Sequence, residues 1–433
     1  MNTVEEAVGF FHSLERFGVN PGLDRIRQLC ELLGHPEKKC SFVHVAGTNG
    51  KGSVCTEISN ILREAGFCTG LYTSPYVLDF RERIQVNNRM ISAEALIDVT
   101  EKIKNAIGVL NAQNIFPTEF EAVTAAAFLY FAACSCDIVV LETGLGGRFD
   151  ATNVIEKPIV SVITSISLDH VKILGNTVEE IAFEKCGIIK ESCHSVTDGA
   201  NPDGALQVIR DTAAARHSFL FEARPDDLFK TVSSDITGTL IRYRDTEMRI
   251  PFLGDHQIRN AAVALKACEV IGVSGFDITV KHIKAGLEAS FIPARTEIMS
   301  KRPLVLLDGS HNDDSTLALA GVLHGYLPEK RIVAVMGMME DKDCEKALQN
   351  LSDCFSHVIA VTPSNPRAMK AENFCSLLLQ NGYSAEAIDD PALGVRKAFS
   401  MMDDFDALVV CGSLYLASDV RSEILDLIAL NNK

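Results

Sequence analysis

The chain has 433 residues, 47% of them apolar and 23% charged, and its formal net charge at pH 7 is -16. These values are typical of a globular protein with two or three domains, and the acidic balance argues against nucleic acid or an anionic membrane as a partner. The thirteen cysteines form no CxxC pair, the first residues lack the basic stretch of a signal peptide, and no apolar run reaches the roughly 20 residues of a membrane span, so we expect a cytoplasmic protein with reduced thiols.

The first part of the chain alternates strands and helices. Two amphipathic helices are expected within residues 1–40, on either side of a turn at residues 18–22. A helix is expected from Ser53 to Ala65, where apolar side chains recur three and four positions apart and Gly66 follows. Further helices are expected at residues 93–110 and 119–133, and strands at 41–46, 67–72, 137–141 and 159–163. This alternation predicts a parallel sheet covered by helices on both faces.

The pattern changes after residue 217. Residues 218–253 alternate apolar and polar side chains between turn signals, which predicts an antiparallel β appendage. A helix at 257–271 and a linker at 291–295 follow, and new strands are expected at 304–307, 332–336, 358–361 and 407–411. We therefore expect an α/β protein: a P-loop-type doubly wound parallel sheet domain with the β appendage, residues 1–295, and then a smaller Rossmann-like α/β domain, residues 296–433.

A glycine-rich segment between a predicted strand and a predicted helix has the features of a phosphate-binding loop. It consists of Gly47, Thr48, Asn49, Gly50, Lys51, Gly52 and Ser53. Glycines let the backbone N–H groups wrap a phosphate, and the lysine neutralises its charge. The strict G-x-x-x-x-G-K-[ST] pattern is not met, because Val45 takes the place of the first glycine and Gly52 follows Lys51 directly. The alternative interpretation is a glycine-rich turn that only begins a helix.

Charged side chains near this loop suggest where metal and substrate bind. Glu142 ends a predicted strand, and ligands of open α/β sheets bind at the carboxyl ends of strands, so its carboxylate suits Mg²⁺. Arg81 and Arg83 lie on one predicted loop and are candidates for binding an anion in an otherwise acidic chain. Either group could instead be a solvated or ion-paired surface feature.

Ordered segments along almost the whole chain resemble the folylpolyglutamate synthase/dihydrofolate synthase family, within the Mur ligase superfamily. The similar segments are residues 47–53, 71–84, 117–128, 141–154, 167–175, 184–190, 253–265, 293–297, 307–312 and 412–421. Two departures are visible, because Cys186 and Ser310 each stand where alanine is common. Both replace one small side chain by another.

The resemblance implies an ATP-dependent ligase. Such an enzyme adds L-glutamate to the carboxylate of a folate, and of dihydropteroate in bifunctional members, through an acyl phosphate and with release of ADP and phosphate. ATP would lie between the two domains. The expected partners are the substrates alone, namely a folate or dihydropteroate, L-glutamate and ATP, and the enzyme is expected to be a monomer. Two rival interpretations stay open: a Mur-type ligase for another carboxylate and amino acid, and a P-loop ATPase whose output is conformational.

The resemblance also implies roles for individual residues. Two Mg²⁺ ions would be held with the help of Ser74, Glu142 and His170, and a monovalent cation such as K⁺ is compatible with the site. Lys185 would be carbamylated by CO₂, which requires a lysine with a lowered pKa near other cations. Besides the phosphate loop, ATP would contact His256, Gln257, Asn260, Arg295 and Asp308, and the catalytic residues would be Lys51, Lys185 and His311.

The predicted substrate-binding residues complete the set. By resemblance, the pterin or folate contacts lie at Arg81, Arg83, Thr118, Phe120, Asp150 and Ala151. Phe120 could stack on a flat pterin ring or could simply fill core space, and the sequence favours neither. The choice between dihydropteroate and tetrahydrofolate is equally open.

Overall fold

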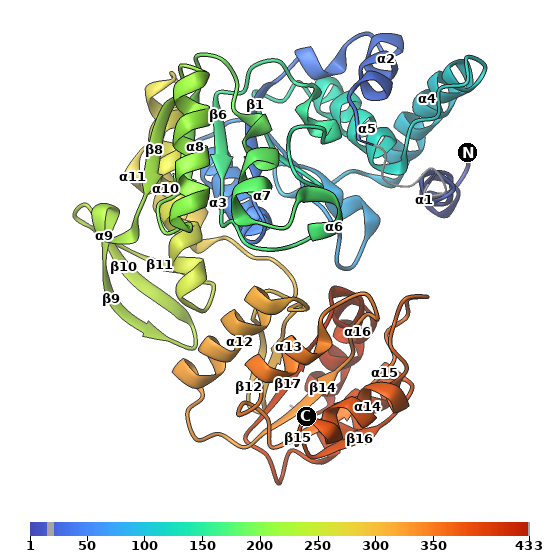
Figure 1. Cartoon of the computed structure of the whole chain (residues 1–433), viewed down its shortest axis with the longest axis vertical. Coiled ribbons are helices and arrows are strands. Elements are labelled where there is room, and N and C mark those ends of the chain that lie inside the picture. The colour runs from blue at the N-terminus through green and yellow to red at the C-terminus, as the bar shows by residue number, and fades with distance from the viewer. Residues whose placement is uncertain (15–20, 432–433) are drawn as a thin grey trace. The chain divides into compact units, whose positions relative to one another are not determined.

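The computed structural model describes residues 1–14 and 21–431, so the turn predicted at residues 18–22 lies mostly outside the described residues. The chain forms two compact units (Figure 1). The first comprises residues 1–232, 240–250 and 257–290, and the second comprises residues 233–239, 251–256 and 291–433. Each unit is an α/β structure, as the alternation of strands and helices predicts.

The first unit is built on an eight-stranded sheet in the order β4-β3-β2-β5-β1-β6-β7-β8. The six strands β2, β5, β1, β6, β7 and β8 are parallel to one another in this order, and β3 and β4 add an antiparallel edge next to β2. Their bounds are β1 Ser41–Ala46, β2 Thr69–Tyr72, β3 Ile84–Val86, β4 Arg89–Met90, β5 Ile138–Glu142, β6 Val160–Ile163, β7 His194–Asp198 and β8 Phe219–Ala223.

Helices cover this sheet. They are α1 Val4–His12, α2 Asp24–Leu32, α3 Lys51–Glu64, α4 Ala93–Asn111, α5 Glu119–Ala133, α6 Val171–Leu174, α7 Val178–Lys185, α8 Asp203–Ala215, α10 Asp255–Val273 and α11 Val280–Glu288, with 3-10 turns η2 Pro36–Lys38, η3 Phe80–Arg83, η4 Ala151–Val154 and η5 Cys186–Ile188. Helices α1, α2, α4 and α5 pack against one another (Figure 1, blue to teal). They enclose a core with Phe11, Phe128 and Phe131 at its centre.

The predicted β appendage is shorter than residues 218–253. Strand β8 pairs in parallel with β7 and is the edge of the main sheet, and the short helix α9, Pro225–Leu228, follows it. The separate three-stranded sheet holds β9 Phe229–Asp235, β10 Gly238–Tyr243 and β11 Thr246–Ile250. The alternation in β8 reflects an edge strand with one exposed face, since Phe219 is 68% exposed, and such a strand resembles an antiparallel one in sequence.

The second unit contains a six-stranded sheet in the order β12-β13-β17-β14-β15-β16, in which only β12 is antiparallel to its neighbour. Its strands are β12 Glu297–Lys301, β13 Leu304–Leu307, β14 Ile332–Met336, β15 His357–Ala360, β16 Ala385–Ala387 and β17 Ala407–Cys411. Its helices are α12 Asp313–Tyr326, α13 Cys344–Asn350, α14 Ala371–Gln380, α15 Pro391–Ser400 and α16 Leu414–Asn431.

Two further observations concern the chain as a whole. All thirteen cysteines are free thiols, which agrees with the expectation of reduced cysteines. Within residues 1–14 and 21–431, no helix has both the length and the apolar character that crossing a membrane requires.

Candidate active site

The predicted phosphate and metal residues follow four strands that are neighbours in the first sheet. Strands β2, β5, β1 and β6 lie side by side and parallel, so their carboxyl ends meet at one edge. Ser74 follows β2, Glu142 ends β5, the loop of residues 47–53 follows β1, and His170 follows β6. The topology therefore gathers four distant sequence segments at the edge where α/β proteins bind ligands.

The loop of residues 47–53 joins β1 to α3 and is held by the segment after β6. The backbone N–H of Thr48 donates to the carbonyl of Ser165 at 2.7 Å. The hydroxyls of Thr164 and Ser165 both donate to the carbonyl of Asn49, at 2.7 and 3.1 Å. These bonds turn the loop's carbonyls toward the protein. The loop is therefore a fixed structure and not a flexible turn.

Glycine is required at Gly50, which precedes α3. Its φ is +83°, a left-handed conformation that side chains rarely adopt, and a Cβ there would collide with the side chain of Asn260. Asn260 lies on α10 and its Nδ2 donates to Oε1 of Gln257 at 2.9 Å. The structure thus brings Asn260 and Gln257 to the start of α3. His256 precedes them on α10 and belongs to the second unit.

Two lysines converge on one carbonyl oxygen of the loop. Nζ of Lys185 donates to the carbonyl of Gly47 at 2.7 Å, and Nζ of Lys51 donates to the same oxygen at 3.0 Å and to that of Thr48 at 3.1 Å. Lys185 ends α7 and is only 4% exposed. Burial, with a smaller contribution from the charge of Lys51, lowers the pKa of Lys185 to about 7. An anion bound here would offset the repulsion between the two ammonium groups.

Glu142 and Ser74 are joined directly. The backbone N–H of Ser74 donates to Oε2 of Glu142 at 3.1 Å, and Glu142 is 4% exposed. His170 adopts a left-handed φ of 49°, and its side chain is 50% exposed, with Nε2 3.9 Å from Oδ2 of Asp169. A non-glycine residue held in this conformation is often a functional one.

These donors fit a hard, water-rich cation. Mg²⁺ takes one or two carboxylates and fills its remaining positions with water and phosphate oxygens. A buried carboxylate beside a hydroxyl supplies that kind of incomplete ligand set. Over the described parts of the chain, no three acidic, histidine or cysteine side chains gather closely enough to hold a metal ion.

The predicted substrate residues Asp150 and Ala151 lie in a loop that Asp150 organises. Its carboxylate accepts hydrogen bonds from the N–H groups of Gly144, Leu145 and Thr152, at 2.9, 2.8 and 3.0 Å, and from the Thr152 hydroxyl. Asp150 is buried, and burial raises the pKa of its carboxyl, an effect that these hydrogen bonds oppose. The carboxylate of Asp150 therefore holds the loop of residues 144–152 in its conformation.

Thr118 and Phe120 stand at the start of α5. The hydroxyl of Thr118 caps the helix by accepting from the N–H of Glu121 at 3.3 Å, and the Glu121 carboxylate accepts in return from the N–H of Thr118 at 2.7 Å. The ring of Phe120 is half-buried and lies 6.0 Å from the ring of Tyr72. It also covers Gly144, where a Cβ would come within 2.5 Å of the ring. Part of Phe120 fills the core and part faces outward.

The two arginines of one loop have different surroundings. Arg81 forms a paired ion contact with Asp79, with distances of 2.6 to 3.1 Å, so its charge is already neutralised. Arg83 is 7% exposed, lies over the rings of Phe80 and Phe120, and reaches Glu119 at 3.5 Å. Its Nε is buried and has no hydrogen-bond partner. Arg83 is therefore better placed than Arg81 to bind an anion.

Within the second unit, Asp308 holds the turn that carries Arg295. Its carboxylate accepts from the N–H groups of Thr296 and Ser310, at 2.7 and 2.8 Å. Ala294 and Thr296, on either side of Arg295, both have left-handed φ values of 55° and 47°. Such strain costs energy, and for the β-branched Thr296 it marks a constrained, often functional, segment. His311 follows β13, and its Nδ1 lies 2.9 Å from the carbonyl of Gly309.

Some residues of the site were not predicted from the sequence. Thr164 and Ser165 support the phosphate loop, and their only signal was a position directly after a buried strand. Arg421 forms a paired contact with Glu297, at 2.6 to 3.2 Å, next to the Arg295 turn. That pair lies 124 positions apart in sequence, so no local pattern could reveal it.

Comparison with known families agrees with this geometry. A model described as the Mur ligase middle domain matches residues 45–268, and one described as the glutamate ligase domain of Mur ligases matches residues 294–414. The two matches together cover most of the chain and place it among the Mur ligases.

Similar proteins show which family of Mur ligases the chain belongs to. The chain is 38% identical to a dihydrofolate synthase/folylpolyglutamate synthase of Bacillus subtilis, over 97% of this chain and 99% of that protein. It is 35% identical to a folylpolyglutamate synthase of Lacticaseibacillus casei, over 97% and 98% of the two chains. This chain belongs to the folylpolyglutamate synthase/dihydrofolate synthase family.

Solved structures give the same result along the whole chain. The folylpolyglutamate synthase of Mycobacterium tuberculosis, solved with ADP and AMPPCP, has a TM-score of 0.88 at 28% identity, over 97% of this chain and 98% of that one. Escherichia coli FolC, solved with DHPP and ADP, has a TM-score of 0.84 at 28% identity, over 100% and 99%. The predicted family and fold class are thereby confirmed.

Proposed function

We propose that this chain is an ATP-dependent ligase that adds L-glutamate to the carboxylate of a folate, and that dihydropteroate is a second acceptor. Family membership carries the ligase activity on folates. In the site itself, the strongest support is the glycine-rich loop of residues 47–53 between β1 and α3, with Nζ of Lys51 held against the carbonyls of Gly47 and Thr48. Such an arrangement binds and neutralises a phosphate chain.

The reaction begins with activation of a poor electrophile. One oxygen of the folate carboxylate attacks the γ-phosphorus of ATP, the bond to the β,γ-bridging oxygen breaks, and ADP leaves. The glutamate amine then attacks the carbonyl carbon of the acyl phosphate, loses a proton, and expels phosphate as the amide forms. Lys51 and the N–H groups of residues 47–53 offset the charge of the transferred phosphoryl group, and positioning supplies most of the remaining catalysis.

We further propose that Ser74, Glu142 and His170 help to hold two Mg²⁺ ions. Bound there, Mg²⁺ would neutralise charge on the phosphates. A monovalent cation such as K⁺ is part of the proposal without assigned residues. The hydrogen bond from the backbone N–H of Ser74 to Oε2 of Glu142, at the carboxyl ends of β2 and β5, supports placing both residues in one metal site.

Lys185 is proposed to carry a carbamate. Its amine must be neutral to attack CO₂, and a pKa of about 7 leaves a large neutral fraction near neutral pH, whereas an ordinary lysine with a pKa of 10.5 is almost fully charged. The new N–C bond forms with loss of a proton from nitrogen. The product is a carboxylate next to Lys51, so a cation is exchanged for an anion in the site.

The remaining assignments belong to the same proposal. The proposed pterin or folate contacts are those predicted from the sequence, namely Arg81, Arg83, Thr118, Phe120, Asp150 and Ala151. In the second unit, Arg295 and Asp308 are proposed to contact ATP and His311 to act in catalysis. His256, Gln257 and Asn260, at the start of α10, are also proposed to contact ATP. The functional division into residues 1–295 and 296–433, a monomeric state and a cytoplasmic location complete it.

The test is ADP release with glutamate and Mg²⁺, measured with tetrahydrofolate, with dihydropteroate and with no acceptor. Turnover on both acceptors is expected. Turnover on tetrahydrofolate alone would remove dihydropteroate from the proposal, and equal ADP release without any acceptor would replace the ligase by an ATPase. Lys51→Met should abolish turnover, whereas Lys102→Met, an exposed lysine paired with Asp98 on α4, should not change it.

A further inference from the structure

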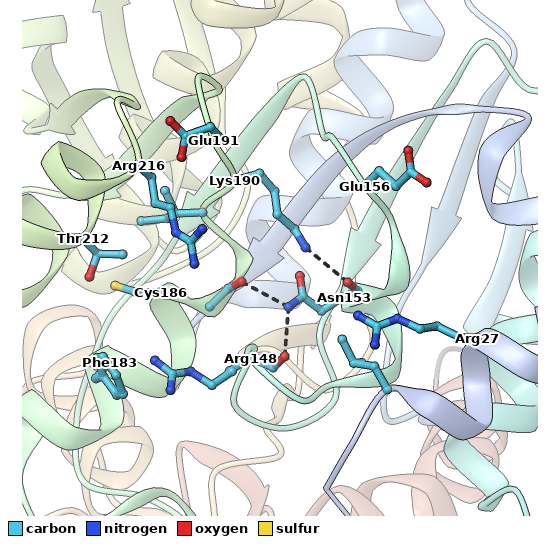
Figure 2. Close-up of a pocket in the computed structure, with 13 residues that line it drawn as sticks. Arg27, Arg148, Asn153, Glu156, Phe183, Cys186, Lys190, Glu191, Thr212 and Arg216 are labelled. Carbon is cyan, nitrogen blue, oxygen red and sulfur yellow. Dashed lines mark hydrogen bonds between the residues drawn. The ribbon is translucent and has the colours of Figure 1, made fainter.

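A pocket in the first unit lies apart from the predicted site residues. It is an open pocket with a volume of about 630 Å³, lined by α2, the loop after β5, the turn after Lys185 and the end of α8 (Figure 2). None of its lining residues is among the predicted catalytic, ATP-, substrate- or metal-binding residues. A volume of this size is typical of pockets for small organic molecules and exceeds what a single inorganic ion needs.

Positive charge is concentrated in this pocket although the chain as a whole is acidic. Four cations line it, namely Arg27, Arg148, Lys190 and Arg216, against two acids, Glu156 and Glu191. Both acids have partners outside the pocket, since Glu156 pairs with Lys38 at 2.9 Å and Glu191 lies 3.9 Å from His217. In Figure 2 their carboxylates point away from Asn153 and Lys190.

Three of the four cations have no carboxylate partner. Within the described residues, no ion pair involves Arg148, Lys190 or Arg216, and only Arg27 is paired, with Asp24 at 3.3 Å. Arg148 instead lies over the ring of Phe183 at 3.8 Å. Lys190 is half-buried, and burial together with the charges of Arg27 and Arg216 lowers its pKa to about 8. Cations that repel one another without a counter-charge would be stabilised by an anion.

The pocket also has an acceptor that none of the described residues satisfies. Asn153 is 6% exposed, and its Nδ2 donates to the carbonyls of Arg148 and Gly187, at 3.0 and 3.1 Å. Its Oδ1 is buried and has no hydrogen-bond partner. Because an unsatisfied buried acceptor is costly, a ligand with an N–H or O–H donor would be favoured at this position.

We propose that this pocket is a second binding site, for a small organic polyanion that also carries an N–H or O–H donor. A short γ-linked glutamate chain has carboxylates and amide N–H groups in one molecule, and choosing it rests on the proposed function. The site would communicate with the active site, since the N–H of Arg148 donates to the carbonyl of Glu184 at 2.8 Å, next to Lys185, and the Arg148 loop carries Asp150. Binding would therefore act on the two loops that position both residues.

The experiment is isothermal titration calorimetry on the full chain with saturating Mg-ADP present, so that the phosphate loop is occupied. The probes are γ-linked triglutamate, tricarballylate, which has three carboxylates and no N–H or O–H donor at neutral pH, and inorganic tripolyphosphate. Triglutamate should bind most tightly. Equal binding of tricarballylate would overturn the role of Asn153, and tighter binding of tripolyphosphate would overturn the choice of a carboxylate ligand.

Matched variants test the location. Arg216→Gln should weaken triglutamate binding about tenfold, as should Lys190→Gln, because each removes one charge-assisted hydrogen bond. Arg210→Gln is the control, since Arg210 lies on the same helix, α8, pairs with Glu222 at 2.6 Å and does not line the pocket. No binding to the unaltered chain at millimolar probe, or equal weakening by Arg210→Gln and Arg216→Gln, would overturn the proposal. ADP release with folate is measured in parallel, so that loss of the pocket ligand and loss of the ligase reaction are distinguished.

Discussion

Replacing Lys185 by methionine should stabilise the protein while it removes activity. In the folded chain the pKa of Lys185 is lowered from 10.5 to about 7, mainly by burial. At roughly 1.4 kcal/mol for each pH unit, the charged lysine costs about 5 kcal/mol. Methionine also removes the hydrogen bond to the Gly47 carbonyl, worth about 1 kcal/mol, although Lys51 still donates to that oxygen. The expected gain in unfolding free energy is therefore about 4 kcal/mol.

This gain should depend on pH in one direction only. Below pH 7 the lysine is charged in both the folded and the unfolded chain, so the full cost of burying the charge is present. Between pH 7 and 10.5 the folded chain releases the proton while the unfolded chain keeps it, and the cost falls. The advantage of Lys185→Met should therefore be largest below pH 7 and should vanish above pH 10.5.

The assay is urea unfolding in CO₂-free buffer at pH 6, 8 and 10, followed by circular dichroism, with the transition of the first unit compared between variants. Lys102→Met is the control, because Lys102 is exposed and its removal should change stability by less than about 1 kcal/mol at every pH. A Lys185→Met advantage that stays constant from pH 6 to 10, or a loss of stability at pH 6, would refute the argument. ADP release by Lys185→Met should fall by about 100-fold or more if the carbamate acts in the reaction.

Three further predictions concern single contacts. Gly50→Ala should cost about 1–3 kcal/mol and weaken ADP binding measured by calorimetry, because its φ of +83° disfavours a side chain and the added Cβ would displace Asn260. Glu142→Gln should raise the Mg²⁺ concentration needed for half-maximal ADP release at least about tenfold, since a charged ligand becomes neutral. Asp308→Asn should lower the thermal stability of the second unit by about 1–3 kcal/mol, because an amide N–H₂ would face the N–H group of Thr296 or Ser310.

Each of these has a matched control. Gly66→Ala also replaces a left-handed glycine, with φ +91°, but no atom lies within 4 Å of its added Cβ, so ADP binding should not change. Glu94→Gln alters an exposed acid and should leave the Mg²⁺ dependence unaltered. Asp390→Asn changes the cap of α15 but keeps an oxygen that can accept from the N–H of Leu393, so the thermal stability of the second unit should change by less than about 1 kcal/mol. If control and test variants behave alike, the assigned contact is not the cause.

Much of the fold could be predicted because buried parallel strands have a distinctive pattern. The expected strands at residues 41–46, 304–307, 332–336 and 407–411 coincide with β1, β13, β14 and β17. Each is a short apolar run between turn residues, and both of its faces are buried. Strands β3, β4, β7, β12 and β16 were missed, and β8 was assigned to the wrong sheet, because polar or exposed residues interrupt their patterns.

The sequence by itself predicted a glycine-rich loop at residues 47–53 between a strand and a helix, because its glycines, its lysine and the flanking elements are local features. It also indicated the family, through ordered motifs over nearly the whole chain. Burial and pairing were decided by the tertiary structure. Only the fold shows that the Asp150 carboxylate accepts from four internal donors and that Arg81 pairs with Asp79, while the predicted substrate-binding roles of both residues stay predictions.

The lowered pKa of Lys185 and the basic pocket have the same origin. A lysine side chain looks ordinary in sequence, and only packing at the end of α7 against the Gly47 carbonyl removes it from water and places Lys51 beside it. Arg27, Arg148, Lys190 and Arg216 come from four separate segments and meet only in the folded chain. Electrostatic properties of a site depend on distances between residues remote in sequence, and those distances are fixed by the packing of the whole unit.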